Sequence, residues 1–410
     1  MDRSILHCDM NNFYASVECV LDPTLKDKPV AVCGNQKERH GIVLAKNYLA
    51  KDKGVKTGDP IWQAKNKCPG IIIIENPNYD MYEYYSKEAI KIYKEYTDRI
   101  ESMGLDECWL DITDSLMLFG KPKDIADTIR ERIKNELGLT ISVGVSFNKV
   151  FAKLGSDYKK PNATTVITKE NFKEIVWPLP ISDMIGIGRK TKVLLNKNLI
   201  FTIGDLANER IERLEYLLGK NGVFLYNAAN GLEDDEVKKY YEIDEVKSIS
   251  HGITTTKDLT KDEEVWSTIL ELTQEISYKL CKKRLRAGGV CVSIRNSDLL
   301  WEQYREKFDT SEQSAIMIAK RAYNLFLERY TWDENIRTVT ISAIYLIDEG
   351  TPEQLNIFED NSKKEKIEKA EKCMQDINNK FGAEVVKNAQ LYLVENIPEA
   401  RRKINYESKR

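Results

Sequence analysis

Two adjacent carboxylates, Asp106 and Glu107, stand in the middle of a segment, Ser102 to Asp111, whose pattern predicts a β-hairpin. Apolar and polar residues alternate on either side of the pair, as they do in short paired strands. A plain surface hairpin would carry turn formers at this place rather than two acids. Two carboxylates on a rigid sheet suit Mg²⁺, which prefers oxygen ligands and shares them with substrate phosphates. A solvated acidic turn is the alternative that the hairpin alone leaves open.

A third carboxylate, Asp9, follows an apolar stretch that predicts a strand close to the N-terminus. The two asparagines at 11 and 12 then indicate a turn into a helix that carries Phe13 and Tyr14. An aspartate after a strand is usually a turn or cap residue, but here it can join the acidic pair of a neighbouring strand. Three carboxylates from two adjacent strands suffice to hold the paired ions of phosphoryl transfer, about 3.5–4 Å apart.

These acids belong to a series of segments that resembles the Y-family (translesion) DNA polymerases. The acids lie in two of the matching motifs, Asp9 to Ala15 and Leu105 to Asp111. The remaining motifs are Asn47-Tyr48-Leu49-Ala50-Lys51, Ser142 to Lys153 with Lys160-Pro161-Asn162, and Ile185-Gly186-Ile187-Gly188. The resemblance runs from about residue 4 to about residue 358, and it is specific because five motifs occur in order, although each alone is weak.

The resemblance implies a template-directed DNA polymerase that adds deoxynucleotides to a primer 3′ end during damage tolerance and the SOS response. Asp9, Asp106 and Glu107 are then the catalytic residues. Together with the Met10 carbonyl they are also the expected ligands of two Mg²⁺ ions, for which Mn²⁺ is expected to substitute. Tyr14 matches the steric gate, whose ring leaves no room for a 2′-hydroxyl, although a core aromatic is the alternative. The residues implied in nucleotide binding are Phe13, Tyr14, Tyr48, Lys51 and Lys160.

Four residues around the expected nucleotide site concern its selectivity. The family most often has Arg at the position of Lys51, so the point charge of an ammonium replaces a guanidinium that can donate two parallel hydrogen bonds. It most often has Thr at the position of Ala45, so this chain lacks a hydroxyl there. This pattern looks closer to the bacterial branch that contains polymerase IV and the catalytic subunit of polymerase V. Ile42 and Leu44 match the roof over the nascent base pair and look bulkier than in members with very open sites.

The pattern of strands and helices predicts an α+β fold with several domains, as the length of 410 residues also suggests. Up to residue 166 the predicted elements follow the β-α-β-β-α-β order of a split βαβ sheet. The resemblance implies a right-hand polymerase with a ferredoxin-like palm, small fingers, a helix-hairpin-helix thumb and an α+β little finger. The expected boundaries are 1–21 and 78–166 for the palm, 22–77 for the fingers, 167–232 for the thumb, 233–246 for a linker, 247–348 for the little finger and 349–410 for a C-terminal tail.

Two features predict contact with primer-template DNA. Gly186 and Gly188 form a turn before a helix, whose N-terminal N–H groups suit a DNA phosphate. A dinucleotide site is excluded because no strand leads into the turn and the full glycine pattern is missing. The formal net charge is only −3, so any basic surface must be local. A run of basic residues could form this surface, and its proposed DNA-binding residues are Lys282, Lys283, Arg284 and Arg286. The alternative is that the run is only the solvated end of a helix.

A short segment in the tail resembles the pentapeptide that bacterial proteins insert into the sliding clamp. It reads Gln354-Leu355-Asn356-Ile357-Phe358, with three apolar anchors and a polar residue in an exposed setting. An ordinary exposed turn is the alternative. The predicted partners are therefore primer-template DNA, deoxynucleoside triphosphates and a bacterial sliding clamp, and the protein is expected to be a monomer.

Composition favours a cytoplasmic protein without a membrane partner. The chain has 8 cysteines but no Cys-x-x-Cys spacing, which fits reduced thiols. Its start shows no signal-peptide pattern, and the longest apolar run, around residues 71–74, is far too short to span a bilayer. Two rival functions remain, a catalytically weak or inactive DNA- and clamp-binding scaffold and a nucleotide cyclase. The intact acids argue against the first, and the thumb, little finger and clamp peptide argue against the second.

Overall fold

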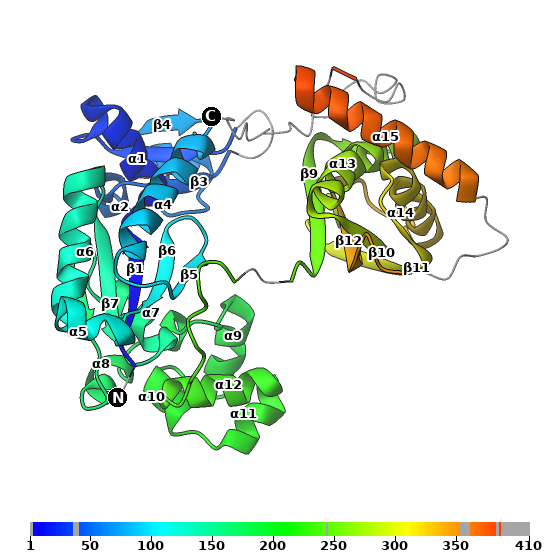
Figure 1. The fold of residues 1–410 in the computed structure, drawn as a ribbon. Helices are drawn as coiled ribbons and strands as arrows, with labels where there is room; N and C mark the ends of the chain where they lie inside the picture. Colours follow the sequence, from blue (N-terminus) through cyan, green and yellow to red (C-terminus); the bar gives the residue numbers. More distant parts are fainter. Residues whose placement is uncertain (1–2, 36–40, 243–244, 353–360, 383–384, 387–410) are drawn as a thin grey trace. The chain divides into compact units, whose positions relative to one another are not determined.

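The computed structural model describes residues 3–35, 41–242, 245–352, 361–382 and 385–386, with the side chains of 361–365 left aside. The chain divides into two compact units, one containing Met1–Gly34 and Ile42–Ile243 and the other containing Asn35–Gly41 and the chain from Asp244 on (Figure 1). Both units combine helices with sheets, so the predicted α+β class is confirmed. None of the helices in these ranges is both long and apolar enough to cross a bilayer.

The first unit is built on a five-stranded sheet with the order β5-β6-β1-β7-β8. Its strands are β1 (Ile5–Met10), β5 (Ile100–Met103), β6 (Glu107–Asp111), β7 (Ile141–Ser146) and β8 (Thr164–Val166). The first four strands pair antiparallel, and β8 adds to β7 in parallel. This is the order of a split βαβ sheet, with β1 and β6 side by side at its centre. The predicted ferredoxin-like arrangement is therefore confirmed.

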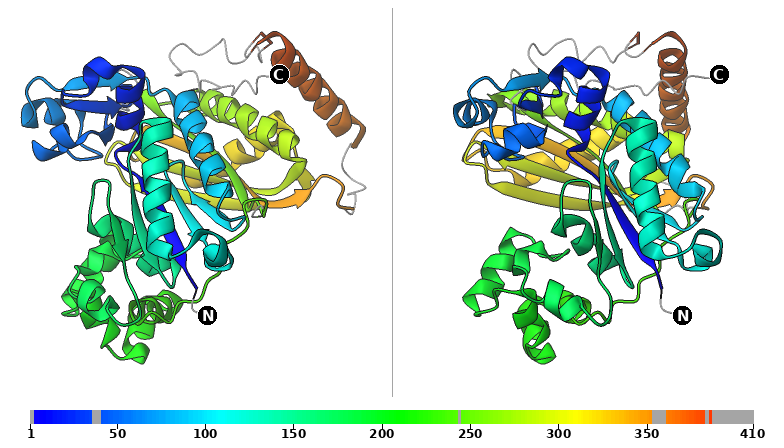
Figure 2. Two further views of the ribbon diagram at one scale, coloured as in Figure 1. Left: turned by 60° about the vertical axis from the view of Figure 1, so that its left-hand side comes forward. Right: turned by 90° about the vertical axis from the view of Figure 1, so that its left-hand side faces the viewer.

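One face of this sheet is covered by α1 (Phe13–Leu21), α4 (Tyr79–Lys94) and α6 (Pro122–Leu137), as Figures 1 and 2 show. Alternate strand residues such as Leu6, Cys8 and Leu110 join their apolar side chains in one core. The intervening residues of β1, among them His7 and Asp9, therefore point to the opposite face, because strand side chains alternate.

The opposite face receives α7 (Lys149–Tyr158). The helix lies unusually close to β7, since a Cβ atom on Gly144 would come within 1.8 Å of the Ala152 carbonyl oxygen. Glycine is thus the residue that permits this approach. Asn148 caps the helix by accepting a hydrogen bond from the Phe151 N–H. As a result, the polar side chains of α7 reach the same face as Asp9.

A small second sheet with the order β3-β2-β4 completes this part of the chain. Strands β2 (Val30–Cys33) and β3 (Val43–Lys46) pair antiparallel, and β4 (Ile72–Glu75) adds to β2 in parallel. The accompanying helices are η1 (Pro23–Leu25), α2 (Tyr48–Asp52) and α3 (Ile61–Lys67), while η3 (Thr113–Ser115) and α5 (Leu116–Phe119) follow β6.

Residues 167–232 contain short helices, as predicted. They are α8 (Phe172–Val176), η4 (Ile181–Asp183), α9 (Arg189–Lys197), α10 (Ile203–Ala207), α11 (Ile211–Leu218) and α12 (Lys220–Ala229). Gly186 adopts a φ of 87°, a left-handed conformation that glycine tolerates, and Gly188 is the N-cap of α9. The predicted turn before a helix is therefore present.

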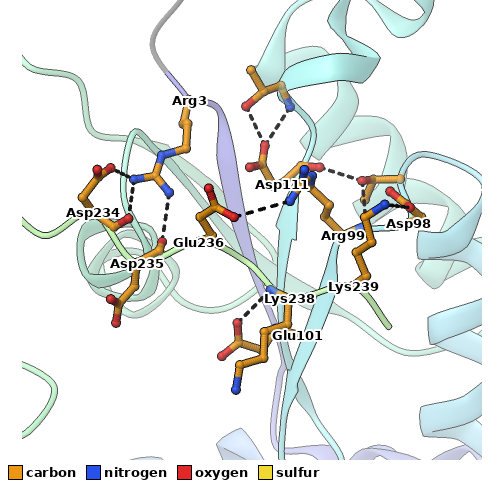
Figure 3. Close-up of polar contacts among 12 residues, drawn as sticks. Arg3, Asp98, Arg99, Glu101, Asp111, Asp234, Asp235, Glu236, Lys238 and Lys239 are labelled. Carbon is orange, nitrogen blue, oxygen red and sulfur yellow. Dashed lines mark hydrogen bonds and ion pairs between the residues drawn. The ribbon is translucent and has the colours of Figure 1, made fainter. Parts of the chain in front are cut away.

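The segment after α12, expected to be a polar linker, is bound to the five-stranded sheet (Figure 3). Val237 is 1% exposed and packs with Ile5 and Trp109. The Arg3 guanidinium donates to the backbone oxygens of Asp234 and Asp235 at 2.8 and 3.0 Å. Farther along, the Lys239 ammonium lies 3.0 Å from Asp98. The polar composition of this segment predicted a linker, but its one buried apolar residue, Val237, attaches it to the sheet.

The second unit contains a four-stranded antiparallel sheet with the order β11-β10-β12-β9. Its elements are β9 (Ser248–Leu259), α13 (Asp262–Lys283), β10 (Leu285–Asn296), β11 (Trp301–Glu312), α14 (Ala315–Arg329) and β12 (Ile336–Asp348). Strand β11 lies at one edge of this sheet. This edge strand is rich in charged residues, a composition that protects sheet edges but hides the strand signal.

A last helix, α15 (Asn361–Phe381), packs against α13 and α14 of the second unit. The Glu371 carboxylate accepts hydrogen bonds from the N–H groups of Ala315 and Ile316, at 2.9 and 3.1 Å, and so caps α14. The Glu368 carboxylate lies 2.7 Å from Arg286, one of the proposed DNA-binding residues. Arg286 is therefore already engaged within this unit.

Candidate active site

Asp9, Asp106 and Glu107 meet where β1 ends and β6 begins. Asp9 lies directly opposite Glu107 in the pairing of these two strands. Asp106 is in the turn just before β6, and its backbone carbonyl accepts a hydrogen bond of 3.0 Å from the Met10 N–H. The structure thus brings the three predicted acids close together, with Asp9 and Glu107 on the face away from the core.

The electrostatics of the three acids differ because of their surroundings. Burial raises the pKa of Asp9 to about 6, in spite of the neighbouring Lys160. Burial, followed by the charge of Glu107, also raises the pKa of Asp106. Burial acts in the same direction on Glu107, but the neighbouring His7 and Lys153 lower its pKa to about 2. Burial thus disfavours the charged forms of Asp9 and Asp106, and a bound cation would offset this cost.

Two lysines hold the acids in place. The Lys160 ammonium lies 2.7 Å from Asp9 Oδ2 and 2.8 Å from Asp157 Oδ1. Burial would lower the pKa of Lys160, but these two carboxylates raise it overall. The Lys153 ammonium forms an ion pair with Glu107. Of these lysines, sequence analysis assigned only Lys160 to the site.

Asn11 fixes the segment that carries Lys160. Its side-chain oxygen accepts a hydrogen bond of 2.9 Å from the Asn162 N–H, while its amide nitrogen donates to Ser142 Oγ at 2.9 Å. Arg130 donates to the Asn162 carbonyl from the other side, at 2.9 Å. Sequence analysis treated Asn11 only as a turn residue. Its place two residues after Asp9, beside the matching Lys160-Pro161-Asn162 motif, was the available signal.

The donor set fits a hard divalent cation, although it is not arranged around one. In the described ranges, no group of three His, Cys, Asp or Glu side chains is arranged to hold a metal ion. Asp9 and Glu107 are instead paired with Lys160 and Lys153. Carboxylates with a backbone carbonyl such as that of Met10 are suitable oxygen ligands for Mg²⁺. Ion binding therefore requires the carboxylates to turn from their lysines.

Tyr14 lies in an aromatic stack next to the acids. Its ring stacks on Tyr82 with 4.2 Å between centroids and 10° between planes, and Tyr79 meets it edge-on. The Tyr82 hydroxyl donates to Glu18. Phe13 is 3% exposed and belongs to the core beneath. The stack leaves Tyr14 half-buried, as expected for a ring that limits space.

The other predicted nucleotide-binding residues lie on and around α2. Tyr48 is the first residue of α2, and the Lys51 ammonium lies 5.3 Å from the centre of its ring. Burial raises the pKa of Tyr48, which also interacts with Lys160 and Asp9. The structure thus brings Tyr48 and Lys160 together near the acids. Ile42 is 43% exposed beside β3 and Leu44 lies within β3, on the small sheet.

The residues predicted to contact DNA and the clamp follow the acidic residues and the nucleotide-binding residues in the sequence. Gly186 and Gly188 precede α9 in the first unit. The basic run belongs to the second unit: Lys282 and Lys283 end α13, and Arg284 follows with a φ of 53°. The clamp segment Gln354 to Phe358 falls outside the described residues.

Comparisons with known proteins extend over the whole of this architecture. A model of the impB/mucB/samB family matches residues 8–157, and the model of its C-terminal domain matches 246–357. A third model, the IMS family HHH motif, matches residues 169–200, which include the turn at Gly186 and Gly188.

Individual relatives agree with the family models. DNA polymerase IV of Acetivibrio thermocellus is 47% identical over 382 residues, which cover 93% of this chain and 96% of that protein. DNA polymerase IV 1 of Bacillus subtilis (strain 168) is 37% identical over 395 residues, covering 94% and 92%. The solved Y-family DNA polymerase chimera Dbh-Dpo4(243-245)-Dbh superposes with a TM-score of 0.73 at 26% identity, covering 84% of this chain and 99% of the chimera. The chain belongs to the impB/mucB/samB family, and with it to the Y-family DNA polymerases.

Proposed function

We propose that this Y-family DNA polymerase performs translesion synthesis with Asp9, Asp106 and Glu107 as the ligands of two divalent cations. The meeting of these acids at the ends of β1 and β6 is the observation that carries the proposal. Bound Mg²⁺ would activate the primer 3′-hydroxyl and stabilise the departing pyrophosphate, and Mn²⁺ would substitute for it. The Met10 carbonyl completes the proposed ligand set.

The remaining residues bind and orient the nucleotide. Lys160, released from Asp9 when a cation arrives, is free to contact the triphosphate with Tyr48 and Lys51, because phosphoryl transfer depends on positioning and charge stabilisation. Tyr14, backed by Tyr82, excludes the ribose 2′-hydroxyl by bulk. Phe13 supports this ring from the core. Ile42 and Leu44 are proposed to cover the nascent base pair.

The proposed active site also implies a role for each domain of the chain. Residues 1–21 and 78–166 are the proposed palm, 22–77 the fingers, 167–232 the thumb and 247–348 the little finger. Primer-template DNA is proposed to contact Gly186 and Gly188 and the basic run at the end of α13. The protein would act as a cytoplasmic monomer in the SOS response, tethered to a sliding clamp by Gln354, Leu355, Ile357 and Phe358.

Removing either member of the acidic pair tests the metal site. Asp106→Ala or Glu107→Ala should abolish primer extension in Mg²⁺, because phosphoryl transfer loses a ligand. DNA affinity should stay within a few-fold, since these acids repel phosphate. The matched control is Asp114→Ala, which removes an exposed acid of η3. Extension near the wild-type rate by either active-site variant would contradict the assignment.

Tyr14→Ala tests the steric gate. The variant should accept ribonucleotides while deoxynucleotide addition stays largely intact, because the ring excludes the 2′-hydroxyl by bulk alone. The measurement is the ratio of kcat/KM for the two sugars, which defines discrimination. Tyr84→Ala, which removes a tyrosine of α4 that is 52% exposed, should leave the ratio unchanged. An unaltered ratio in Tyr14→Ala would make Tyr14 a core aromatic only.

Changing Lys282 and Lys283 together to alanine tests the basic run. If both contact phosphates, the slope of log affinity against log salt should become shallower by about two units, roughly one per contact. Arg286→Ala should change the slope less, because Glu368 already engages this side chain. The charge-matched control changes Lys87 and Lys91, two exposed lysines of α4, to alanine. Equal slopes for the test and control pairs would mean a solvated helix end.

The double variant Leu355→Ala with Phe358→Ala tests the clamp segment. A short peptide concentrates its binding in a few buried anchors, so the isolated segment should bind a bacterial clamp with about micromolar affinity, near −8 kcal/mol. The variant should extend primers normally alone but lose the gain from a loaded clamp, since tethering raises its local concentration. A full response to the clamp would place the contact elsewhere in the chain.

A further inference from the structure

A buried histidine stands behind the catalytic carboxylates without an assigned role. His7 lies two residues before Asp9 on β1, is 0% exposed and meets Trp109 edge-on. Its Nδ1 lies 2.8 Å from the hydroxyl of Ser156 on α7. Its Nε2 has no hydrogen-bond partner in the described residues, and it faces Glu107 Oε2 at 3.4 Å. Lys153 and Asp157 are the other charged groups that act on this ring.

The hydrogen-bond inventory of these groups permits two arrangements. A neutral imidazole carries one N–H, and the Ser156 hydroxyl has one hydrogen to donate. If Nδ1 holds the proton, it donates to Ser156, whose hydroxyl then donates to the Lys153 carbonyl, 2.8 Å away. In that arrangement a bare Nε2 lone pair faces a carboxylate. If Nε2 holds the proton, it points at Glu107 and Nδ1 accepts from Ser156.

The second arrangement places a donor opposite every acceptor, because the Lys153 carbonyl lies within α7 and can accept an ordinary helical hydrogen bond. The first leaves two acceptors facing each other in a buried site, which is unfavourable. The distance of 3.4 Å exceeds an ordinary N–H···O bond. Catalytic hydrogen bonds are often long before substrate arrives and then tighten.

We propose that His7 is a positioning residue for Glu107: the Ser156 hydroxyl fixes the imidazole with its proton on Nε2, and this N–H holds the carboxylate toward the metal site. Lys153 must leave Glu107 when a cation binds, because two positive charges would compete for the same carboxylate. The neutral N–H of His7 carries no such charge and can keep its contact with Glu107. His7 thus retains the orientation of Glu107 across both states. This inference rests on the proposed role of Glu107 as a metal ligand.

The tautomer can be observed without any activity measurement. The chain has 3 histidines, so ¹⁵N-histidine labelling gives few signals, and His7→Gln identifies those of His7 by their loss. The metal-free protein should show His7 with a protonated Nε2 and a bare, hydrogen-bonded Nδ1. Ser156→Ala should shift the Nδ1 signal toward that of an unbonded nitrogen. A proton on Nδ1 in the wild-type protein would overturn the proposal.

Two substitutions at His7 separate positioning from packing. Phenylalanine keeps a ring without a donor, and glutamine offers an N–H near the place of Nε2. Because groups behind metal ligands change affinity about 10- to 100-fold, His7→Phe should weaken Mn²⁺ binding at least about tenfold by electron paramagnetic resonance. Its kcat should fall while KM for the deoxynucleotide changes little, and His7→Gln should recover most of both losses. Thermal unfolding identifies any variant that fails to fold.

The outcomes also separate this inference from the proposed metal site. If Glu107→Ala keeps full Mn²⁺ affinity and extension, the metal site itself is wrong. If Glu107→Ala is inactive but His7→Phe binds Mn²⁺ and extends primers like the wild type, His7 serves packing only and the inference alone fails. Equal losses in His7→Phe and His7→Gln would overturn it as well, because the donor would not matter.

Discussion

Mutual repulsion among three carboxylates is the constraint on which the catalytic half of the molecule depends. Acids this close on adjacent strands cannot all be ionised without nearby positive charge. Lys153 and Lys160 provide it in the absence of a cation, and both come from α7 or the turn after it. That helix reaches the sheet only because Gly144 has no side chain. One glycine in β7 is thus a condition for the charge balance of the site.

The same lysines would give the proposed site two states. A divalent cation and a lysine would compete for the same carboxylate oxygens, so cation binding would free an ammonium group to contact the triphosphate. Burial raises the pKa of Asp9 and of Asp106 even beside these lysines, so a bound cation would stabilise their charged forms. Asn11 keeps the Lys160 segment attached to β1 throughout, through its bonds to Asn162 and Ser142. Exchange of counter-ions therefore needs side-chain motion only.

The sequence predicts features that depend on neighbouring residues better than contacts between distant segments. The bounds of helix α6 are marked in the sequence itself, because Pro122 occupies its first turn and Gly138 ends it with a φ of 69°. The acids were found because their spacing on paired strands is itself a chemical signal. Contacts between distant segments have no such signal, so the pairing of Lys153 with Glu107, the bond from His7 to Ser156 and the cap from Glu371 to α14 were missed.

The bound segment after α12 decides where the catalytic half of the chain ends as a folding unit. A fragment cut at Leu232 would lose Val237, whose burial over Ile5 and Trp109 contributes about 1.5–3 kcal/mol by area, and would leave Arg3 without its backbone acceptors. The buried Val237 and the ion pair of Lys239 with Asp98 hold this connector against the sheet despite its polar composition, although residues 234–236 and 240–242 are exposed. A self-sufficient catalytic fragment should therefore keep the contacts of Val237 and Lys239 and extend beyond residue 232, the predicted end of the thumb.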